Sequence, residues 1–404
     1  MQRRFPRPWE IRRLVKFRKF IWNGKTRRLS RAMTVADLRN LAKKRTPKGQ
    51  FDYVEGGAEA EITLQRNLDF FQRVQFSPHV LRDISKIDLG SQLLGKHTNL
   101  PFGFAPTGYT RMMHVDGEIA VSSAAARNEI PYVLSTMGTT SMSELAKEVN
   151  NGNNWFQLYL WKDREKSLKF LADARNAGVD TLVLTVDVPR TSRRLRDVRN
   201  GLTIPPTITM KTFFNTLTRF GWLKDFLSTE PLTFASFADY HGTIADLSNS
   251  MFDPTNTFED LKWLRNEWNG NLVIKGVQRI DDVRKAIDAG VDAIWLSNHG
   301  GRQLDRSPSP MEILPEMISH FGNEIDFYVD GGITSGADIV TAIALGAKYT
   351  FVGRAYLYGL MAGGEAGVDR AIEILKTEIS QTMIFLGASS LQELTPDLIY
   401  PRSH

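Results

Sequence analysis

The sequence predicts an α/β fold, a TIM-type (β/α)8 barrel with an N-terminal helical extension and a long loop after the fourth strand. From about residue 100 onward, short apolar runs rich in Val, Ile or Phe alternate with amphipathic helical stretches, and eight such pairs follow one another. Eight consecutive strand-then-helix units are what a closed barrel requires. The alternative, an open doubly wound sheet, usually carries a glycine fingerprint after its first strand. Neither GxGxxG nor the P-loop pattern occurs here.

The elements can be placed along the sequence in order. Residues 34–60 are expected to form two short helices before the barrel. In the stretches after the strands, apolar residues recur at i, i+3 and i+4 and a Gly closes the helix, as in 167–178 and 281–290. The connection 188–256 is far longer than an ordinary loop, and its aromatic segment 219–237 is expected to form a lid or a membrane-contact surface. The eight strands are predicted at residues 101–108, 131–136, 154–160, 181–187, 271–277, 293–298, 326–332 and 349–355.

The positive charge of the chain is concentrated at its N-terminus. The formal charge is +6, yet residues 1–31 carry twelve Lys or Arg and a single acid, so the rest is net acidic and no nucleic-acid partner is expected. We therefore divide the chain into a basic leader, 1–33, and a barrel domain, 34–404. Aromatic and aliphatic residues interleave with the basic ones, as in interfacial anchors attracted to anionic lipid. A solvated arm and a mitochondrial-type targeting peptide are the alternatives.

Two absences narrow the classes of function. The chain has no cysteine, which excludes disulfides, thiolate catalysis, Cys-ligated zinc and iron–sulfur clusters. We assign no metal ligands, and redox chemistry would need an organic cofactor. No stretch reaches the ~18 consecutive apolar residues of a spanning helix. The protein is expected in the cytoplasm or as a peripheral protein on the inner face of the cell membrane.

Polar side chains gather at the carboxyl ends of the predicted strands, which meet at one mouth of a barrel. His299 is the candidate general base because imidazole titrates near neutrality, and Asp187 is its candidate partner. A hydrogen-bonded structural histidine is the alternative. The set at these ends is Thr107, Ser135, Gln157, Tyr159, Thr185, Asp187, Lys275, Ser297, His299, Arg302, Asp330, Gly331, Gly332, Gly353 and Arg354.

Arginines near the same ends suggest that the ligand is an anion. Arg302 and Arg194 offer two guanidinium forks that can hold one carboxylate in a fixed orientation. Arg193 and Arg196 are expected instead to be solvated or paired with Asp197.

Lys275 and two glycine-rich turns add to this picture. Lys275 ends an apolar strand, which is costly for an ammonium group unless it faces an anion or a developing negative charge. The turns 330–332 and 352–354 follow the seventh and eighth strands, where barrels commonly hold a phosphate. Arg354 would add positive charge there.

With these residues, the chain resembles the FMN-dependent 2-hydroxy acid oxidases and dehydrogenases from about residue 34 to the C-terminus. SNHGGRQLD is close to diagnostic for that family, and FDYVEGGAEAE, FAPTG, WFQLY, LTVDVP, VIKG, DGG and GRAYLYG stand in the family's order. The basic leader, RTPKGQFDY, RDVRNGLTIPP and YLYGLMAGGEAGVDRAIEIL are most similar to the bacterial quinone-linked L-lactate dehydrogenases.

The resemblance implies FMN in the barrel mouth and a 2-hydroxy acid above it. It implies that Arg302, Arg194 and the Tyr53 hydroxyl hold the substrate carboxylate, and that Tyr159 bonds the substrate oxygen. His299, paired with Asp187, would remove a proton as two electrons pass to the flavin, whose reduced form Lys275 would steady. The implied FMN contacts are Ala105, Pro106, Thr107, Gly108, Ser135, Gln157, Thr185, Lys275 and Ser297 for the flavin, and Asp330, Gly331, Gly332, Thr334, Gly353 and Arg354 for the phosphate.

Two positions depart from the family pattern. Thr334 stands where many members place an arginine near the phosphate, so phosphate binding is expected to rest more on Arg354 and on backbone amides. Met137 stands where some members carry a tryptophan over the substrate, and a flexible thioether there fits a small substrate.

The resemblance implies oxidation of L-lactate to pyruvate, with electrons leaving to a quinone or a similar carrier. The nearest alternative reoxidises the flavin with oxygen, produces hydrogen peroxide and prefers glycolate or a larger hydroxy acid. A barrel isomerase or lyase acting on phosphorylated substrates would use the same phosphate turns without needing His299 and two arginines. A homo-oligomer, by analogy a tetramer, is also expected.

Overall fold

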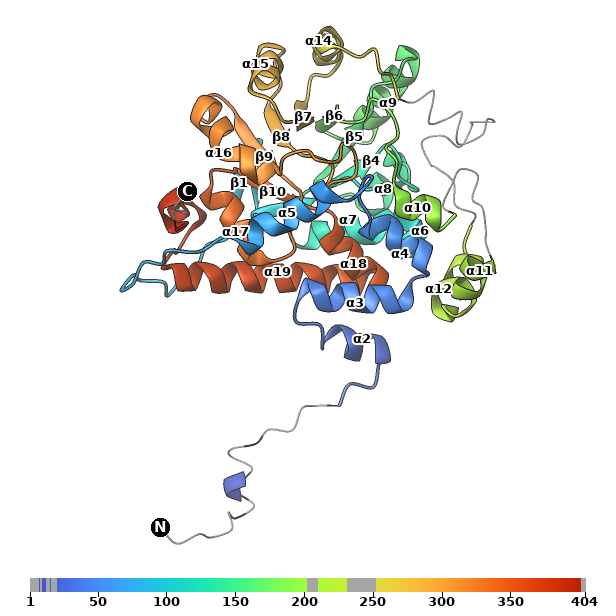
Figure 1. Ribbon diagram of the computed structural model, residues 1–404, viewed down its shortest axis with the longest axis vertical. Helices are drawn as coiled ribbons and strands as arrows, with labels where there is room; N and C mark the ends of the chain where they lie inside the picture. Colours follow the sequence, from blue (N-terminus) through green and yellow to red (C-terminus); the bar gives the residue numbers. More distant parts are fainter. Residues whose placement is uncertain are drawn as a thin grey trace.

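Eight parallel strands close into a barrel in the computed structural model, in the order β10-β3-β4-β5-β6-β7-β8-β9 (Figure 1). The predicted (β/α)8 fold is therefore confirmed. The structure describes residues 7, 9–11, 15, 20–201, 210–230 and 252–400, so most of the basic leader before residue 20 and the insertion residues 202–209 and 231–251 lie outside the described residues. The barrel strands are β3 (Phe102–Phe104), β4 (Tyr132–Ser135), β5 (Asn154–Leu158), β6 (Thr181–Thr185), β7 (Asn271–Val277), β8 (Ala293–Leu296), β9 (Asp326–Val329) and β10 (Tyr349–Val352).

Each barrel strand lies inside a predicted run, but most strands end before the run does. The polar residues at the end of these runs leave the strand ladder and form the loops of the barrel mouth. After β9, Gly331 and Gly332 have φ angles of 94° and 81°, a region that residues with side chains rarely adopt. The candidate site residues therefore stand mainly on loops that the strands anchor.

Large side chains fill the barrel interior. Trp295 of β8 stacks on Phe351 of β10, with ring centroids 3.8 Å apart and an interplanar angle of 22°. Trp155 and Tyr328 pack against the same phenylalanine from other strands. The interior is thus a packed core, so a ligand must bind at an end of the barrel.

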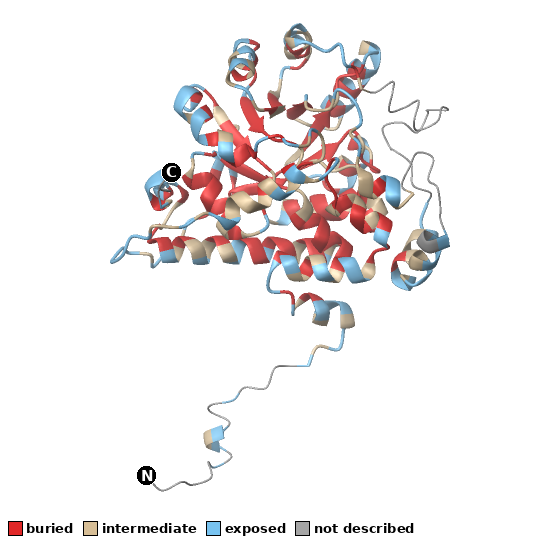
Figure 2. Cartoon of the chain, in the orientation of Figure 1, coloured by how far each residue is buried: buried red, intermediate tan, exposed pale blue. Residues whose placement is uncertain are grey.

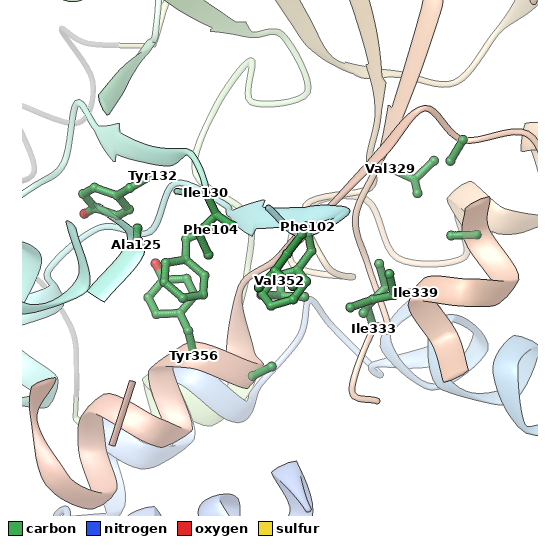
Figure 3. Close-up of a cluster of buried hydrophobic side chains, with 14 of the residues drawn as sticks. Phe102, Phe104, Ala125, Ile130, Tyr132, Val329, Ile333, Ile339, Val352 and Tyr356 are labelled. Carbon is green, nitrogen blue, oxygen red and sulfur yellow. The ribbon is translucent and has the colours of Figure 1, made fainter. Parts of the chain in front are cut away.

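A second core lies between the barrel and the helices around it, whose inner faces are buried and outer faces exposed (Figure 2). Figure 3 shows part of it, where Phe104 of β3 meets Tyr356 of α18 with ring centroids 4.6 Å apart. The Tyr356 hydroxyl also donates to the Ala105 carbonyl at 3.1 Å. The helices around the barrel are α7 (Gly117–Arg127), α8 (Met142–Glu148), α9 (Arg164–Asn176), α14 (Phe258–Glu267), α15 (Ile280–Asp288), α16 (Pro310–Phe321), α17 (Gly336–Ala344), α18 (Arg354–Gly363) and α19 (Glu365–Leu386).

From residue 20 onward, the described N-terminal extension forms four helices that pack on the body. The helices expected in 34–60 are α3 (Val35–Arg45) and α4 (Lys48–Glu55), preceded by α2 (Gly24–Leu29) and followed by α5 (Ile62–Gln72). Within the predicted leader, Leu29 is buried and lies against Gly363 of α18. At the barrel mouth, α5 packs on the turn after β8, where a Cβ on Gly301 would lie 2.6 Å from the Leu64 backbone.

An antiparallel hairpin at the opposite end of the barrel was not predicted. It consists of β1 (Ser91–Leu93) and β2 (Lys96–Thr98). Lys96 forms an ion pair with Asp180, which directly precedes β6, so the hairpin lies at the amino ends of the strands. Leu93 is buried with the residues of the barrel interior, which closes this end.

The described parts of the 188–256 insertion include three helices, and two of them dock beside the barrel mouth. The three helices are α10 (Leu195–Arg199), α11 (Met210–Leu217) and α12 (Phe220–Leu227), and α11 lies beside α4 (Figure 1). The indole of Trp222 donates to the carbonyl of Met112 in the short helix α6 (Thr110–Met113) at 3.1 Å, and Lys48 donates its backbone N–H to Asn215 at 2.7 Å. Among the described residues, no helix is both long enough and apolar enough to cross a bilayer.

Candidate active site

A cavity of about 1360 Å³ opens at the carboxyl ends of the strands, between the barrel mouth and the N-terminal and insertion helices. Most of the predicted site residues line it. Four others, Gln157, Thr185, Asp187 and Ser297, are buried or partly buried at the strand ends next to lining residues. The predicted residues that line the cavity are Tyr53, Ala105, Pro106, Thr107, Gly108, Ser135, Tyr159, Arg194, Lys275, His299, Arg302, Asp330, Gly331, Gly332, Thr334, Gly353 and Arg354.

His299 and Asp187 form a pair although 112 residues separate them in the sequence. His299 Nδ1 lies 3.0 Å from Asp187 Oδ1 and 3.3 Å from Oδ2, which leaves Nε2 as the ring nitrogen available to the cavity. Burial alone would raise the pKa of Asp187, but His299 and Lys275 hold that pKa below its usual value. Gly276 permits this approach, because a Cβ there would lie 2.7 Å from the Asp187 Cβ. The arrangement suits a histidine that accepts a proton beside a permanent negative charge.

The turn that carries His299 has an unusual backbone. His299, Gly300 and Gly301 have φ angles of 59°, 64° and 76°, so three consecutive residues are left-handed. Only glycine adopts this region freely, which explains the two glycines after the histidine. His299 carries the strain of the same conformation, and such strain persists only where neighbouring contacts fix it.

Asn67 of α5 supplies those contacts and was missed by the sequence analysis. Its side-chain amide exchanges two hydrogen bonds with that of Asn298, at 2.9 and 2.8 Å, and both side chains are buried. Asn298 also accepts the Gly301 N–H at 3.0 Å. Asn67 touches the phosphate turn as well, because a Cβ on Gly332 would lie 2.3 Å from its carbonyl oxygen. A lone polar residue on an amphipathic helix gives no sequence signal for this role.

Two arginines and one aromatic ring, predicted to hold an anion, lie together in the cavity wall. The guanidinium carbons of Arg302 and Arg194 lie 4.9 and 5.2 Å from the centroid of the Tyr53 ring. Arg302 Nη1 donates to the carbonyls of Tyr53 and Gly56 at 2.5 and 3.0 Å, which fixes the side chain. Burial and the neighbouring Arg194 charge lower the pKa of Arg302 to about 9. A carboxylate between the two guanidinium groups would offset that cost.

The pairing of the neighbouring arginines differs in part from the expectation. Arg193 and Arg196 were expected to be solvated or to pair with Asp197. Arg193 is indeed solvated, 76% exposed and 3.6 Å from Glu59, whereas Arg196 pairs with Glu61. Arg194 itself lies 3.3 Å from Asp197. The acids Glu59 and Glu61 lie about 130 residues upstream in the chain, so sequence proximity could not reveal these pairs.

Lys275 is buried with a set of compensating groups. Its ammonium donates to Ser297 Oγ at 2.7 Å and lies 3.1 Å from Asp330 Oδ2. Ser297 in turn donates to Asp330 Oδ1 at 2.6 Å. The Asp330 carboxylate offsets the free-energy cost of burying the Lys275 charge. Lys275 also lines the cavity.

Directly behind residues that line the cavity lie buried polar atoms that fit a flavin. Gln157 Nε2 and Thr185 Oγ1 are buried and have no hydrogen-bond partner among the described residues. Buried polar groups are rarely left unpaired, so these atoms indicate a ligand with its own donors and acceptors. Ser135 donates to Gln157 Oε1 at 3.1 Å, and Thr107 Oγ1 lies 2.5 Å from the Tyr356 hydroxyl, which fixes both sides of the cavity floor.

The turns after β9 and β10, which were predicted to bind a phosphate, differ in which backbone N–H groups have no side-chain partner. The Thr334 N–H and hydroxyl both bond Asp338, at 2.7 and 3.2 Å, as part of the N-terminal cap of α17. Gly353, in contrast, begins α18 without a side-chain cap among the described residues, and a Cβ there would meet nothing within 4 Å. The Arg354 guanidinium donates at 2.9 Å to the carbonyls of Val54, Gly56 and Gly300. The backbone amides at the start of α18 are thus available to an anion. A phosphate at this site, with side-chain contacts from Thr334 and Arg354, stays a prediction.

The cavity lining also includes residues that the strand-end motifs did not indicate, among them Phe252, Tyr109 and Gln50. Phe252, at the end of the insertion, packs against Tyr159 with ring centroids 5.3 Å apart. Tyr109 follows the 105–108 stretch and accepts a positive φ of 58°. Gln50 of α4 has a buried Oε1 with no partner among the described residues. Nothing in their local sequence sets them apart from packing residues.

Comparison with known proteins identifies the relatives of this chain. The family model described as FMN-dependent dehydrogenase matches residues 42–401. A Mycobacterium tuberculosis protein provisionally named as an L-lactate dehydrogenase is 50% identical over 396 residues, which cover 98% of this chain and 96% of that protein. The (S)-mandelate dehydrogenase of Pseudomonas putida is 38% identical, over 90% of this chain and 93% of its own. The crystal structure of a monotopic membrane protein, (S)-mandelate dehydrogenase, superimposes with a TM-score of 0.89 at 37% identity, over 92% of this chain and 100% of the other.

Proposed function

Because the chain belongs to the FMN-dependent dehydrogenase family, we propose that this enzyme oxidises L-lactate to pyruvate and passes the electrons to a quinone. The observation that carries the proposal is the convergence of the His299–Asp187 pair and the two arginines on one cavity. That geometry matches a small substrate with a carboxylate next to a carbinol group that gives up a proton as it is oxidised. Relatives named L-lactate dehydrogenase support lactate as the substrate.

The chain's own residues divide the work as follows. Arg302 and Arg194 bind the substrate carboxylate beside the Tyr53 ring and set the orientation of the substrate. Tyr159 bonds the substrate hydroxyl oxygen. The Nε2 atom of His299 accepts a proton from the substrate, and Asp187 stabilises the imidazolium that results.

FMN, when bound, supplies the acceptor for the two electrons that the substrate loses. The 105–108 stretch, Ser135, Gln157 and Thr185 would hold the flavin, and Lys275 would place a buried positive charge beside it. The residues proposed for the phosphate are Asp330, Gly331, Gly332, Thr334, Gly353 and Arg354, with the backbone amides of α18 as the main donors.

Lactate oxidation is tested with the purified enzyme under anaerobic conditions. We expect a yellow protein whose absorbance at about 450 nm bleaches when L-lactate is added. A colourless protein, or one that bleaches with other 2-hydroxy acids but not with lactate, would contradict the proposal. In aerobic turnover we expect fast reduction of decylubiquinone and little hydrogen peroxide. Rapid peroxide formation without quinone reduction would favour the oxidase alternative.

We also propose that the enzyme works at the inner face of the cell membrane, as a homo-oligomer. A neighbour described as a monotopic membrane protein supports membrane contact. The basic leader and the exposed apolar side chains of the insertion helices, such as Phe220 at 81% exposure, are suitable for anionic lipid. The tetramer remains an analogy with relatives.

Removal of residues 1–22, before α2, tests the role of the leader. The full chain should sediment with vesicles that contain anionic phosphatidylglycerol. The truncated chain should bind these vesicles at least about tenfold more weakly, because it loses most of the basic residues of the leader. Lactate turnover with ferricyanide serves as the control for folding and should be unchanged. Equal vesicle binding by both chains would show that the leader is not the anchor.

A further inference from the structure

The active-site cavity extends past the predicted flavin and substrate positions into an apolar lobe. We call this the outer lobe and define it by Met112 of α6, Phe213 of α11, and Trp222, Leu223 and Phe226 of α12, all of which line the cavity. Met112 follows the 105–108 stretch of the cavity floor by a few residues. The lobe therefore begins beside the place proposed for the flavin ring.

The walls of the outer lobe are held in place by several contacts. Trp222 donates its indole N–H to the Met112 carbonyl at 3.1 Å and stacks on Phe226 with ring centroids 4.8 Å apart. Arg45 of α3 pairs with Asp225 of α12. These contacts fix α12 against the barrel mouth, so the lobe is part of the folded structure.

The cavity wall includes one polar side chain of α4, the helix that packs on α6 and α11 of this lobe. Gln50 of α4 lines the cavity, and its buried Oε1 accepts no hydrogen bond from any described residue. A carboxamide can accept from a hydroxyl and, through its nitrogen, donate to a carbonyl. It could thus bond both an oxidised quinone and the reduced quinol.

Beyond the lobe, the apolar character continues to the protein surface. Phe213 and Leu227 line the cavity and are also 47% and 73% exposed, and Phe214 and Phe220 of the same helices are 58% and 81% exposed. A substrate as small as lactate would not fill the lobe or reach this apolar surface. A flat ring with a long apolar tail would fill the lobe with its ring and lay its tail along these helices.

We propose that the outer lobe is the binding site for the head group of a membrane quinone, with Gln50 as its hydrogen-bond partner. The inference rests on the proposed function and assigns a place to its electron acceptor. The overall exchange is balanced: hydroxy acid and quinone become keto acid and quinol, and two electrons and two protons move from the first to the second. A side-chain pocket for bulky hydroxy acids is the competing use of the lobe.

The test fills the lobe with Leu223→Trp and removes the polar contact with Gln50→Leu. With decylubiquinone as acceptor, we expect the apparent KM for quinone to rise at least about tenfold in each variant, since each loses roughly 1.4 kcal/mol or more of binding. Turnover of lactate with ferricyanide and anaerobic bleaching by lactate should stay at the level of the unmodified enzyme. Leu168→Trp, the same substitution at an exposed leucine of α9 outside the cavity, is the matched control and should change turnover with neither acceptor.

Binding is measured independently of turnover by tryptophan fluorescence. Titration of the resting enzyme with decylubiquinone should quench a component that is absent in Trp222→Phe and weakened in Gln50→Leu. Unchanged quinone KM and quenching in both lobe variants would overturn the proposal, as would a selective loss of bulky hydroxy acids in Leu223→Trp. If the unmodified enzyme reduces ferricyanide but never decylubiquinone, the proposed electron acceptor is wrong, and so is the proposed quinone site in the outer lobe.

Discussion

His299→Gln is expected to remain folded and yellow but to be reduced by L-lactate about three orders of magnitude more slowly than the unmodified enzyme. Glutamine has a side-chain amide that can still donate to Asp187, so the buried carboxylate keeps a hydrogen-bond partner. It has no group that can accept and hold a proton near neutral pH, so the general base is lost. The measurement is the rate of anaerobic bleaching at about 450 nm after rapid mixing with saturating lactate.

His320→Gln is the matched control for this substitution. His320 is an exposed histidine in the last turn of α16, outside the cavity, so its replacement should leave the rate unchanged. If His299→Gln were reduced at a normal rate, His299 would be a structural residue and the proposed mechanism would be wrong. Loss of the yellow colour would mean that the substitution disturbed cofactor binding.

Arg302→Lys should chiefly weaken the binding of lactate. Arg302 donates from Nη1 to the carbonyls of Tyr53 and Gly56 and has further N–H groups for a carboxylate. A lysine has one ammonium group, which cannot bond these carbonyls and a carboxylate together. A hydrogen bond between charged groups contributes about 1.5–3 kcal/mol, so the KM for lactate should rise roughly 10- to 100-fold. We expect a smaller change in kcat, because Arg194 still holds the substrate.

Steady-state kinetics with ferricyanide give both constants for this variant. Arg193→Lys is the matched control, since Arg193 is 76% exposed and lies 3.6 Å from Glu59 rather than in the cavity. Its KM should equal that of the unmodified enzyme. An unchanged KM in Arg302→Lys, with a normal melting temperature, would show that this arginine does not hold the carboxylate.

Much of the barrel and of its mouth could be predicted from the sequence, for a physical reason. Parallel strands in a barrel end at one face, so residues after two different strands meet however far apart they are in the chain. The pairing of His299 with Asp187 follows from this rule together with their complementary chemistry. The apolar runs themselves are conspicuous because both faces of each strand are buried, as in the all-buried pattern of β8.

The remaining features depend on contacts that no local pattern encodes. Asn67 lies 231 residues from Asn298, and its role depends on how α5 sits across the mouth. Arg354 was expected to act on a phosphate because of its charge, yet its side chain bonds three carbonyls that the fold brings together. The β1–β2 hairpin is only three residues per strand, too short for a periodic signal.

The placement of Asn67 between two loops has a practical consequence for protein engineering. The Asn67 side-chain amide bonds Asn298 in the turn that carries His299, while its backbone oxygen would lie 2.3 Å from a Cβ added at Gly332. A redesign that adds even a methyl group at Gly332, for instance to change how the cofactor is bound, would push α5 outward. It would at the same time disturb the turn that carries His299. The two loops can be rebuilt only as a pair, together with the helix that spans them.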